Sequence, residues 1–191
     1  MEEKSILKMR QEGIYARNHS IYDSHVFIHG ERMEFAMQDI FPPAVRVMLP
    51  VSFLEMPVVM AREKYPSEYR PKVILTSPDL LVNFAFQYYE ERIREEEVAT
   101  AARYYYSILQ KCYPGYGFLE CSECLREGEH VLAWYSYSSP TINDTLFHIH
   151  AFTAVEGRLL QCIFNAPQPL FDCWKPYASE VFRSVGTGRI L

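Results

Sequence analysis

A stretch framed by two prolines limits, more than any other feature, how this chain can fold. It covers residues 64–71 and is followed at once by two strand-like runs, 72–76 and 82–86. Pro66 and Pro71 fix φ and push the residue before each of them out of helical conformation. The link therefore cannot continue the helix on its amino side or the strand on its carboxyl side. The sequence predicts a helix, a stiff connection and two strands, in this order.

The rest of the pattern indicates a mixed fold dominated by antiparallel strands. Apolar residues recur at three- and four-residue spacing in 95–112 and 173–185, which is typical of helices with one buried face. A shorter helix is expected over 53–65, after a strand over 45–50. Four later segments are expected to be strands: 117–125, 130–137, 146–155 and 159–165. Because both faces of these strands carry apolar residues, we predict an α+β fold, an α/β/α sandwich with a mostly antiparallel sheet flanked by helices.

Residues 1–40 precede this pattern and are predicted to be an amino-terminal extension, with 41–191 as the main domain. Within the extension, 26–28 and 33–37 are expected to pair as a β-hairpin around His29-Gly30. The sequence leaves two roles open for this arm. It closes an edge of the sheet, or it exchanges between two subunits of a homodimer.

The composition argues against several classes of partner. A net charge of −5 gives no positive field for a phosphate backbone, so we expect no nucleic-acid partner. No apolar run is long enough for a membrane span, and the first residues lack the layout of a signal peptide. We therefore expect no membrane partner and a cytoplasmic location. The five cysteines are odd in number and irregularly spaced, which is typical of reduced thiols rather than of a disulfide framework.

Six segments follow one another in a recognisable order: 45–50, 64–71, 82–84, 111–114, 152–165 and 174–185. Their order and spacing resemble the PsbP-like α/β sandwich family over about residues 41–186. That family includes the extrinsic photosystem II subunit, a nuclear import factor that binds the GTPase Ran, and many uncharacterised bacterial proteins, which this chain resembles most. The resemblance implies a fold and a role as a binding protein or assembly factor, with no catalytic residues to carry over. The photosystem and Ran-binding activities are not transferred, because one fold serves many functions.

Cys121 and Cys124 form a C-x-x-C pair, which is typical of zinc or thiol redox sites when both sulfurs converge. Here the pair lies in a strand-like segment, where residues an odd number apart point to opposite faces. If Glu127-Gly128 is a two-residue turn, Cys121 pairs with Trp134 and Cys124 with Val131. We interpret both thiols as small buried hydrophobic groups.

His148 and His150 lie two residues apart in a predicted strand, so their imidazoles share one face of the sheet. A metal site needs a third ligand, and Cys162 on the next strand is the natural candidate. With a two-residue turn at 156–157, however, Cys162 pairs with Ala151 and so lies away from the histidines. We interpret the histidines as packed under a helix or at the solvent edge, with metal binding as the weaker alternative.

Tyrosine and arginine are enriched in the energetic centres of protein interfaces. The candidates for partner binding are Tyr65, Tyr69 and Arg70 in the proline-framed link and Tyr104 in the long helix. No recognisable motif joins a nucleophile to a histidine, so we expect no enzymatic activity, no catalytic residue and no cofactor.

The predicted function is a non-catalytic protein-binding or adaptor domain. The alternatives are a small-molecule or metal-binding protein, or an enzyme with an unrecognised His/Cys site. An exposed aromatic patch would favour the first of these functions. A deep pocket lined with titratable groups would count against it.

Overall fold

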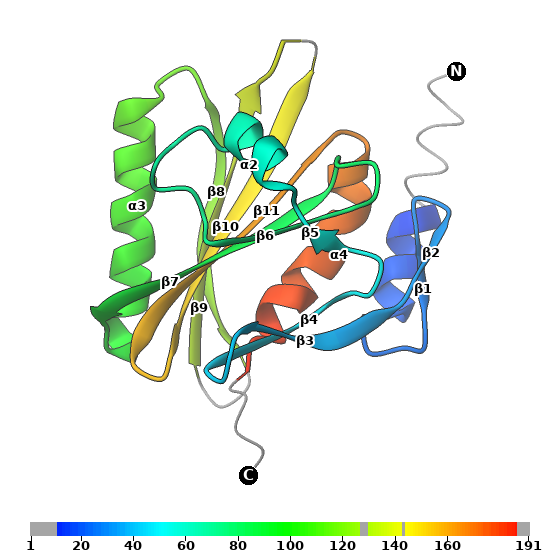
Figure 1. The fold of residues 1–191 in the computed structure, drawn as a ribbon, viewed down its shortest axis with the longest axis horizontal. Coiled ribbons are helices and arrows are strands. Elements are labelled where there is room, and N and C mark those ends of the chain that lie inside the picture. Colours follow the sequence, from blue (N-terminus) through cyan, green and yellow to red (C-terminus); the bar gives the residue numbers. More distant parts are fainter. Residues whose placement is uncertain (1–10, 127–129, 143, 187–191) are drawn as a thin grey trace.

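The computed structural model describes residues 11–126, 130–142 and 144–186. Its centre is a seven-stranded sheet in the order β5-β6-β7-β11-β10-β9-β8, and every neighbouring pair is antiparallel (Figure 1). The strands are β5 (Leu54–Glu55), β6 (Val73–Thr76), β7 (Asn83–Arg92), β8 (Gly117–Arg126), β9 (His130–Pro140), β10 (Thr145–Val155) and β11 (Arg158–Pro167).

Helices cover both faces of this sheet (Figure 1). α3 (Val98–Cys112) packs on β9 and β10, and the short α2 (Val58–Lys64) packs beside it over β6, β7 and β11. α4 (Leu170–Arg183) packs on the opposite face, where β11 is its main strand contact. The predicted α+β sandwich with a mostly antiparallel sheet is therefore confirmed.

The larger core lies between the sheet and α4. Phe84 of β7 and Phe164 of β11 are fully buried, with ring centroids 5.2 Å apart. Trp174 of α4 packs edge-on against Phe84 at 6.2 Å. Aromatic pairs of this kind combine large buried areas with a preferred geometry, so they hold α4 on the sheet in one orientation.

A two-residue turn fixes the pairing of β10 with β11. Glu156 and Gly157 have φ of 49° and 74°, the left-handed pair that matches the twist of a hairpin. The resulting register pairs Ile149 with Phe164 and Ala151 with Cys162. The predicted turn and pairing are confirmed, and they place His148 and His150 together on the face covered by α2 and α3.

The amino-terminal segment packs on the side of the molecule that carries α4 (Figure 1). Residues 11–18 are helical, and β1 (Val26–Ile28) pairs with β2 (Glu31–Met33) around His29-Gly30. β3 (Phe35–Phe41) does not continue this hairpin, because it pairs with β4 (Val45–Pro50) instead. The two pairs form separate two-stranded sheets, so within the described residues the arm closes no edge of the large sheet.

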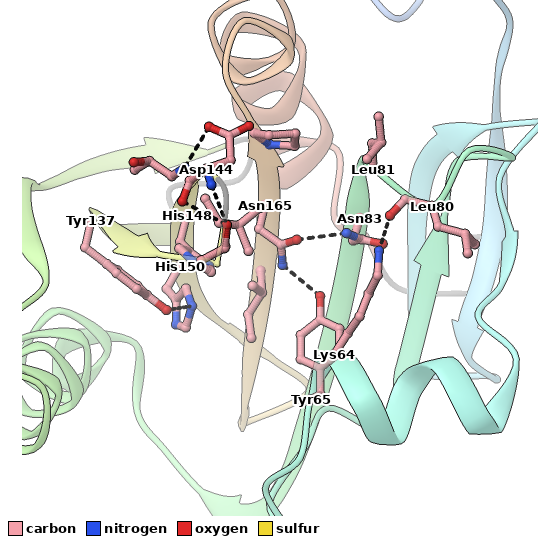
Figure 2. Close-up of a pocket in the computed structure, with 15 residues that line it drawn as sticks. Lys64, Tyr65, Leu80, Leu81, Asn83, Tyr137, Asp144, His148, His150 and Asn165 are labelled. Carbon is pink, nitrogen blue, oxygen red and sulfur yellow. Dashed lines mark hydrogen bonds between the residues drawn. The ribbon is translucent and has the colours of Figure 1, made fainter.

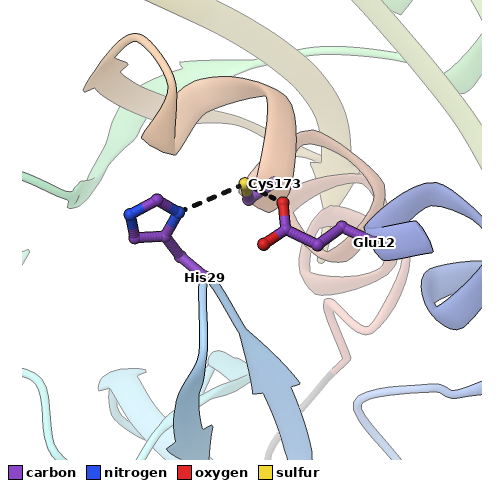
Figure 3. A group of neighbouring side chains, drawn as sticks. All are labelled: Glu12, His29 and Cys173. Carbon is purple, nitrogen blue, oxygen red and sulfur yellow. Dashed lines mark hydrogen bonds between the residues drawn. The ribbon is translucent and has the colours of Figure 1, made fainter. Parts of the chain in front are cut away.

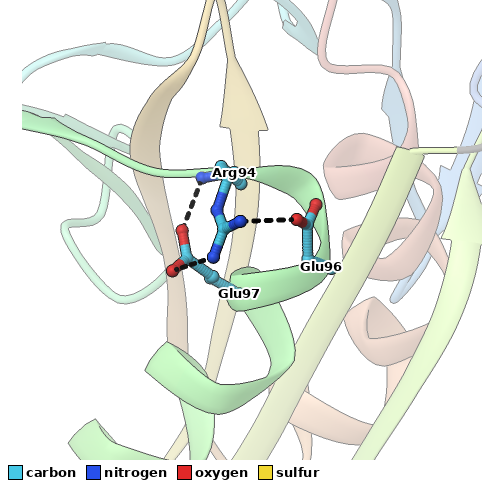
Figure 4. A network of polar contacts seen from close by, with 3 residues as sticks. All are labelled: Arg94, Glu96 and Glu97. Carbon is cyan, nitrogen blue, oxygen red and sulfur yellow. Dashed lines mark hydrogen bonds and ion pairs between the residues drawn. The ribbon is translucent and has the colours of Figure 1, made fainter.

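A polar cap fixes the start of α3 (Figure 4). Glu95–Glu97 form a short 3₁₀ turn, η1, that leads into the helix. The Glu97 carboxylate accepts from the Arg94 backbone N–H and guanidinium, both at 3.0 Å, and Arg94 also pairs with Glu96 at 3.3 Å. The predicted acidic helix start is therefore organised by one arginine, which sets where the chain leaves β7.

Three local predictions were wrong in their boundaries. The second hairpin arm expected over 33–37 pairs with β1 only at Met33, since residues 35–37 belong to β3 and pair with β4. α2 begins at Val58 and not at residue 53, because residues 54–55 pair with β6 and Pro57 precedes the helix. Cys121 pairs with Tyr135 and Cys124 with Leu132, one position away from the predicted register. Three residues separate the paired Arg126 and His130, so a two-residue connection does not fit; the predicted Glu127-Gly128 turn itself lies outside the described residues.

Candidate functional site

A cavity opens on the face of the sheet that α2 and α3 cover, and we call it the α2–α3 cleft (Figure 2). Its volume is about 530 Å³, which lies in the usual range for small-molecule sites. α2 covers Ile74, Ala85 and Ile163 on one side of this face, and α3 covers the far parts of β9 and β10 on the other. The cavity itself is lined by the end of α2, by residues 80–83 and by parts of β9, β10 and β11, and its lining includes no residue of α3.

The floor of the cleft is built by strand alternation. His148 and His150 of β10 point into it together with Tyr137 of β9 and Ile163 and Asn165 of β11. In the register of β10 with its neighbours, His148 lies beside Tyr137 and Asn165, and His150 lies beside Ile163. The intervening residues face the α4 core, so a single pattern of period two makes both the core and the floor.

A chain of hydrogen bonds fixes the protonation of His150. The Tyr89 hydroxyl donates to Gln161 Oε1 at 2.8 Å, so the Gln161 amide nitrogen donates to His150 Nδ1 at 3.1 Å. Nδ1 therefore carries no proton, and the neutral ring keeps its proton on Nε2. Nε2 lies 3.2 Å from the Tyr137 hydroxyl oxygen and donates to it. Tyr137 is part of the lining of the cleft, and its hydroxyl keeps a proton that can be donated.

His148 is held in a different way. Its ring stacks on Tyr137 with centroids 4.4 Å apart and planes 5° apart, and its Nε2 lies 2.9 Å from Ser139 Oγ. Burial lowers the pKa of both His148 and His150 to about 3, and for His150 the neighbouring His148 adds to the effect. Both rings are therefore uncharged at neutral pH.

A second polar row ties β7 and β11 to the segment after α2. The Asn83 amide nitrogen donates to Asn165 Oδ1 at 2.8 Å, and the Asn165 amide nitrogen donates to the Tyr65 hydroxyl at 2.7 Å (Figure 2). Burial raises the pKa of Tyr65 to about 12, so this row also carries no charge.

One polar atom in this row is unsatisfied. Asn83 is only 3% exposed and lines the cleft, and its Oδ1 has no hydrogen-bond partner among the described residues. A buried acceptor without a donor costs about 1–3 kcal/mol, so such atoms are rare and call for an explanation. An unpaired acceptor on a residue of the lining is a group that a donor bound in the cleft would satisfy.

Charge is confined to the rim. Lys64 donates from its ammonium to the backbone carbonyl oxygen of Leu80, and burial lowers its pKa although Asp79 raises it. Asp144 is exposed on the lining of the cleft. Leu80 itself has φ of 64°, a left-handed conformation that is uncommon for a branched side chain and is often found at functional sites.

The candidate residues from the sequence fall in different places. His148 and His150 are brought together in the cleft, and Tyr65 reaches it from the end of α2. Tyr69 is 93% exposed, and Tyr104 is 63% exposed on the outer side of α3. Arg70 is half-buried and lines a separate shallow hollow beside α2. Of the four partner-binding candidates, Tyr65 lies in the cleft with the histidines, and Tyr69, Arg70 and Tyr104 lie outside it.

Sequence reasoning missed Asn83, Asn165, Tyr137 and Lys64. Asn83 and Asn165 stand in otherwise apolar strand runs, and this was a usable signal because a buried amide needs a partner. Their pairing across β7 and β11 depends on a strand order that the local pattern does not contain.

The cysteines give no second cluster in the sheet. Cys121 is exposed and Cys124 is half-buried on the opposite face, so their sulfurs do not converge. The predicted burial of both thiols was wrong, because β8 is the edge strand of the sheet. None of the five cysteines forms a disulfide, and Cys162 is buried in the α4 core, away from the histidines as predicted.

Comparisons with known proteins bear on the fold. No protein-family model and no curated protein matches the chain. Among solved structures, cyanobacterial PsbP (CyanoP) from Synechocystis sp. PCC 6803 matches with a TM-score of 0.56 and 12% identity, over 80% of this chain and 92% of that one. The chain has the PsbP-like fold.

Two further structures share this PsbP-like arrangement. LpqN of Mycobacterium tuberculosis, a protein involved in cell envelope biogenesis, matches with a TM-score of 0.50 and 12% identity, over 87% of this chain and 96% of that one. A Bacteroides thetaiotaomicron protein matches with a TM-score of 0.51 and 12% identity, over 79% of this chain and 48% of that one. At this identity the likeness defines the fold and not the ligand. In the part of the chain that the structure describes, no helix is long and apolar enough to cross a membrane.

The neutral histidines should link stability to pH. Their pKa is about 6.5 in the unfolded chain and about 3 in the folded one, so between these values the unfolded chain binds more protons. We expect the free energy of unfolding to fall as the pH drops from 6.5 toward 4, by at most about 1.4 kcal/mol per pH unit for each histidine.

Urea unfolding between about pH 4 and pH 7.5 measures this slope. Carboxylates also titrate in this range, so the comparison is with the His148→Gln/His150→Gln double variant and with each single variant. A variant that keeps the full slope of the parent chain would show that the histidines are not held neutral.

Proposed function

We propose that this chain is a non-catalytic binding module that holds a small, mostly apolar molecule in the α2–α3 cleft. The observation that carries the proposal is a cavity of about 530 Å³ whose lining includes Asn83, a residue with a buried and unpaired Oδ1. Apolar walls with a few fixed polar groups are the usual composition of a ligand site.

The polar groups define what the ligand must offer. Asn83 Oδ1 requires a hydrogen-bond donor, such as an amide N–H or a hydroxyl, and the Tyr137 hydroxyl can donate to an acceptor on the same molecule. The residues of the floor are uncharged, and the charges of Lys64 and Asp144 stay at the rim. A ligand with a neutral buried part fits this arrangement, because an unpaired buried charge is costly.

The state of the histidines supports a binding role over catalysis. A general acid or base works best when its pKa lies near the working pH. His148 and His150 are far below that range, and both rings are tied to Ser, Tyr and Gln side chains. They are built to orient neighbours and present neutral hydrogen-bonding edges.

The test is a fragment screen by ligand-observed NMR with pairs of compounds that differ at one donor. We expect amide or hydroxyl fragments to bind, and their N- or O-methylated analogues to bind about tenfold more weakly, because the analogue leaves Oδ1 unpaired. Leu146→Trp, which places a large ring in the cleft, should abolish binding. The matched control is Leu119→Trp on exposed β8, which should bind as the parent chain does.

Binding that is unchanged by Leu146→Trp would place the ligand elsewhere and overturn the proposal. Equal binding of the donor fragments and their methylated analogues would show that Asn83 Oδ1 does not accept a hydrogen bond from the ligand.

A protein partner is the second candidate function, and a different surface favours it. α2 has no fully buried residue, and Val58, Val59 and Leu54 are 66%, 68% and 69% exposed. Tyr69 follows on the proline-framed link and is also exposed. Apolar groups gathered on a rigid surface are typical of interaction sites.

Affinity capture from a lysate of the protein's own source tests this surface. We expect one partner in near-equal amount with the parent chain and with the control Leu119→Lys, and its loss with Val58→Lys/Val59→Lys. These lysines would place charge in an apolar contact, which is costly when desolvated. A partner that survives the double variant, or none with any chain, would refute this second role.

A further inference from the structure

Three side chains with metal-ligating atoms meet where the amino-terminal segment packs on α4 (Figure 3). They are Glu12 from the helical residues 11–18, His29 from the β1–β2 turn and Cys173 from the first turn of α4. Their ligating atoms all lie within 4.8 Å of one another. Cys173 Sγ is 2.8 Å from Glu12 Oε2 and 3.7 Å from His29 Nδ1.

The fold holds these elements in place by other contacts. Ser20 Oγ and the Ile21 backbone N–H both donate to the Glu180 carboxylate of α4, at 2.7 and 2.9 Å. Ile21 is 1% exposed, so the arm is anchored in the core next to α4. His29 has φ of 52° and Gly30 has φ of 82°, a left-handed turn that aims the imidazole back at the helix. The cluster is therefore preorganised rather than a chance contact of mobile side chains.

We propose that Glu12, His29 and Cys173 form a three-ligand site for a divalent transition metal, with zinc as the ion it fits best. Thiolate, imidazole and carboxylate together are a zinc ligand set, and magnesium or calcium would not take the sulfur. The site lies on the α4 side of the sheet and is independent of the α2–α3 cleft.

The distances agree with a tetrahedral ion. Bonds of about 2.3 Å to sulfur and about 2.0–2.1 Å to nitrogen and oxygen place the ligand atoms about 3.4–3.6 Å apart. The Cys173 Sγ to His29 Nδ1 separation of 3.7 Å is close to this range. The Glu12 carboxylate lies closer because it accepts from the thiol, and it would retreat by roughly 0.8 Å to reach the zinc geometry.

Binding of the ion displaces one proton from the cluster. The ion replaces the S–H···O hydrogen bond, the sulfur binds as thiolate, and one proton is released to solvent for each ion bound. A small cavity of about 60 Å³, lined by Glu12, Cys173, Asp172 and Pro176 among others, adjoins the cluster and has room for a water as fourth ligand. The bound ion would fasten the amino-terminal segment and the β1–β2 turn to α4.

The experiment uses the full chain, stripped with a chelator and titrated with Co²⁺ and then Zn²⁺. We expect one equivalent of Co²⁺ to give the near-ultraviolet thiolate charge-transfer band and the visible bands of tetrahedral cobalt, and one equivalent of Zn²⁺ to displace it. The melting temperature should rise with the metal, because an ion that binds only the folded chain stabilises it.

Variants assign the ligands. Cys173→Ser should abolish the thiolate band, and His29→Gln and Glu12→Gln should each weaken Zn²⁺ binding by at least about 100-fold, since even the loss of an outer-shell partner costs 10–100-fold. The control Cys121→Ser/Cys124→Ser removes the C-x-x-C pair and should bind as the parent chain does. No stoichiometric binding to the parent chain, or binding that survives both Cys173→Ser and His29→Gln, would overturn the proposal.

Discussion

The antiparallel register of β10 and β11 is the constraint on which the rest of this structure depends. The left-handed turn at Glu156-Gly157 sets this register. It sends Phe164 and its neighbours into the α4 core and turns His148 and His150 to the opposite face. A slip by one residue would exchange the two sets. That exchange would bury imidazoles against α4 and expose phenylalanines, so core packing and site geometry are enforced by the same pairing.

The face of the sheet that α2 and α3 cover shows how the energetic cost of a buried polar site is kept low. Its histidines, tyrosines and amides are uncharged, and nearly every one of the polar groups discussed here has a partner within the sheet or on α2. Such a network is stable only when its members are satisfied. The buried acceptor on Asn83 is the exception, and Asn83 is part of the lining of the cleft. An unsatisfied residue in the wall of a cavity is the physical basis for a binding role.

Local pattern was enough to predict the late strands, the long helix and the pairing around Glu156-Gly157, because two-residue turns leave one register. It failed for β8 and β9, where the connection is longer than the predicted turn and the pairing shifts by one position. The sites were harder still. Asn83 and Asn165 meet across 82 residues, and His29 and Cys173 meet across 144. Contacts at such separations depend on the strand order and on how the amino-terminal arm packs on α4. A short segment of sequence predicts neither of these.

The most direct test of a ligand-binding cleft is a high-resolution crystal structure of the protein purified, without denaturation, from its own source. The account predicts ordered non-protein density in the α2–α3 cleft, with a donor atom about 2.7–3.2 Å from Asn83 Oδ1. A cleft filled by its own side chains, with Oδ1 bonded to a protein donor or to a single enclosed water, would contradict it.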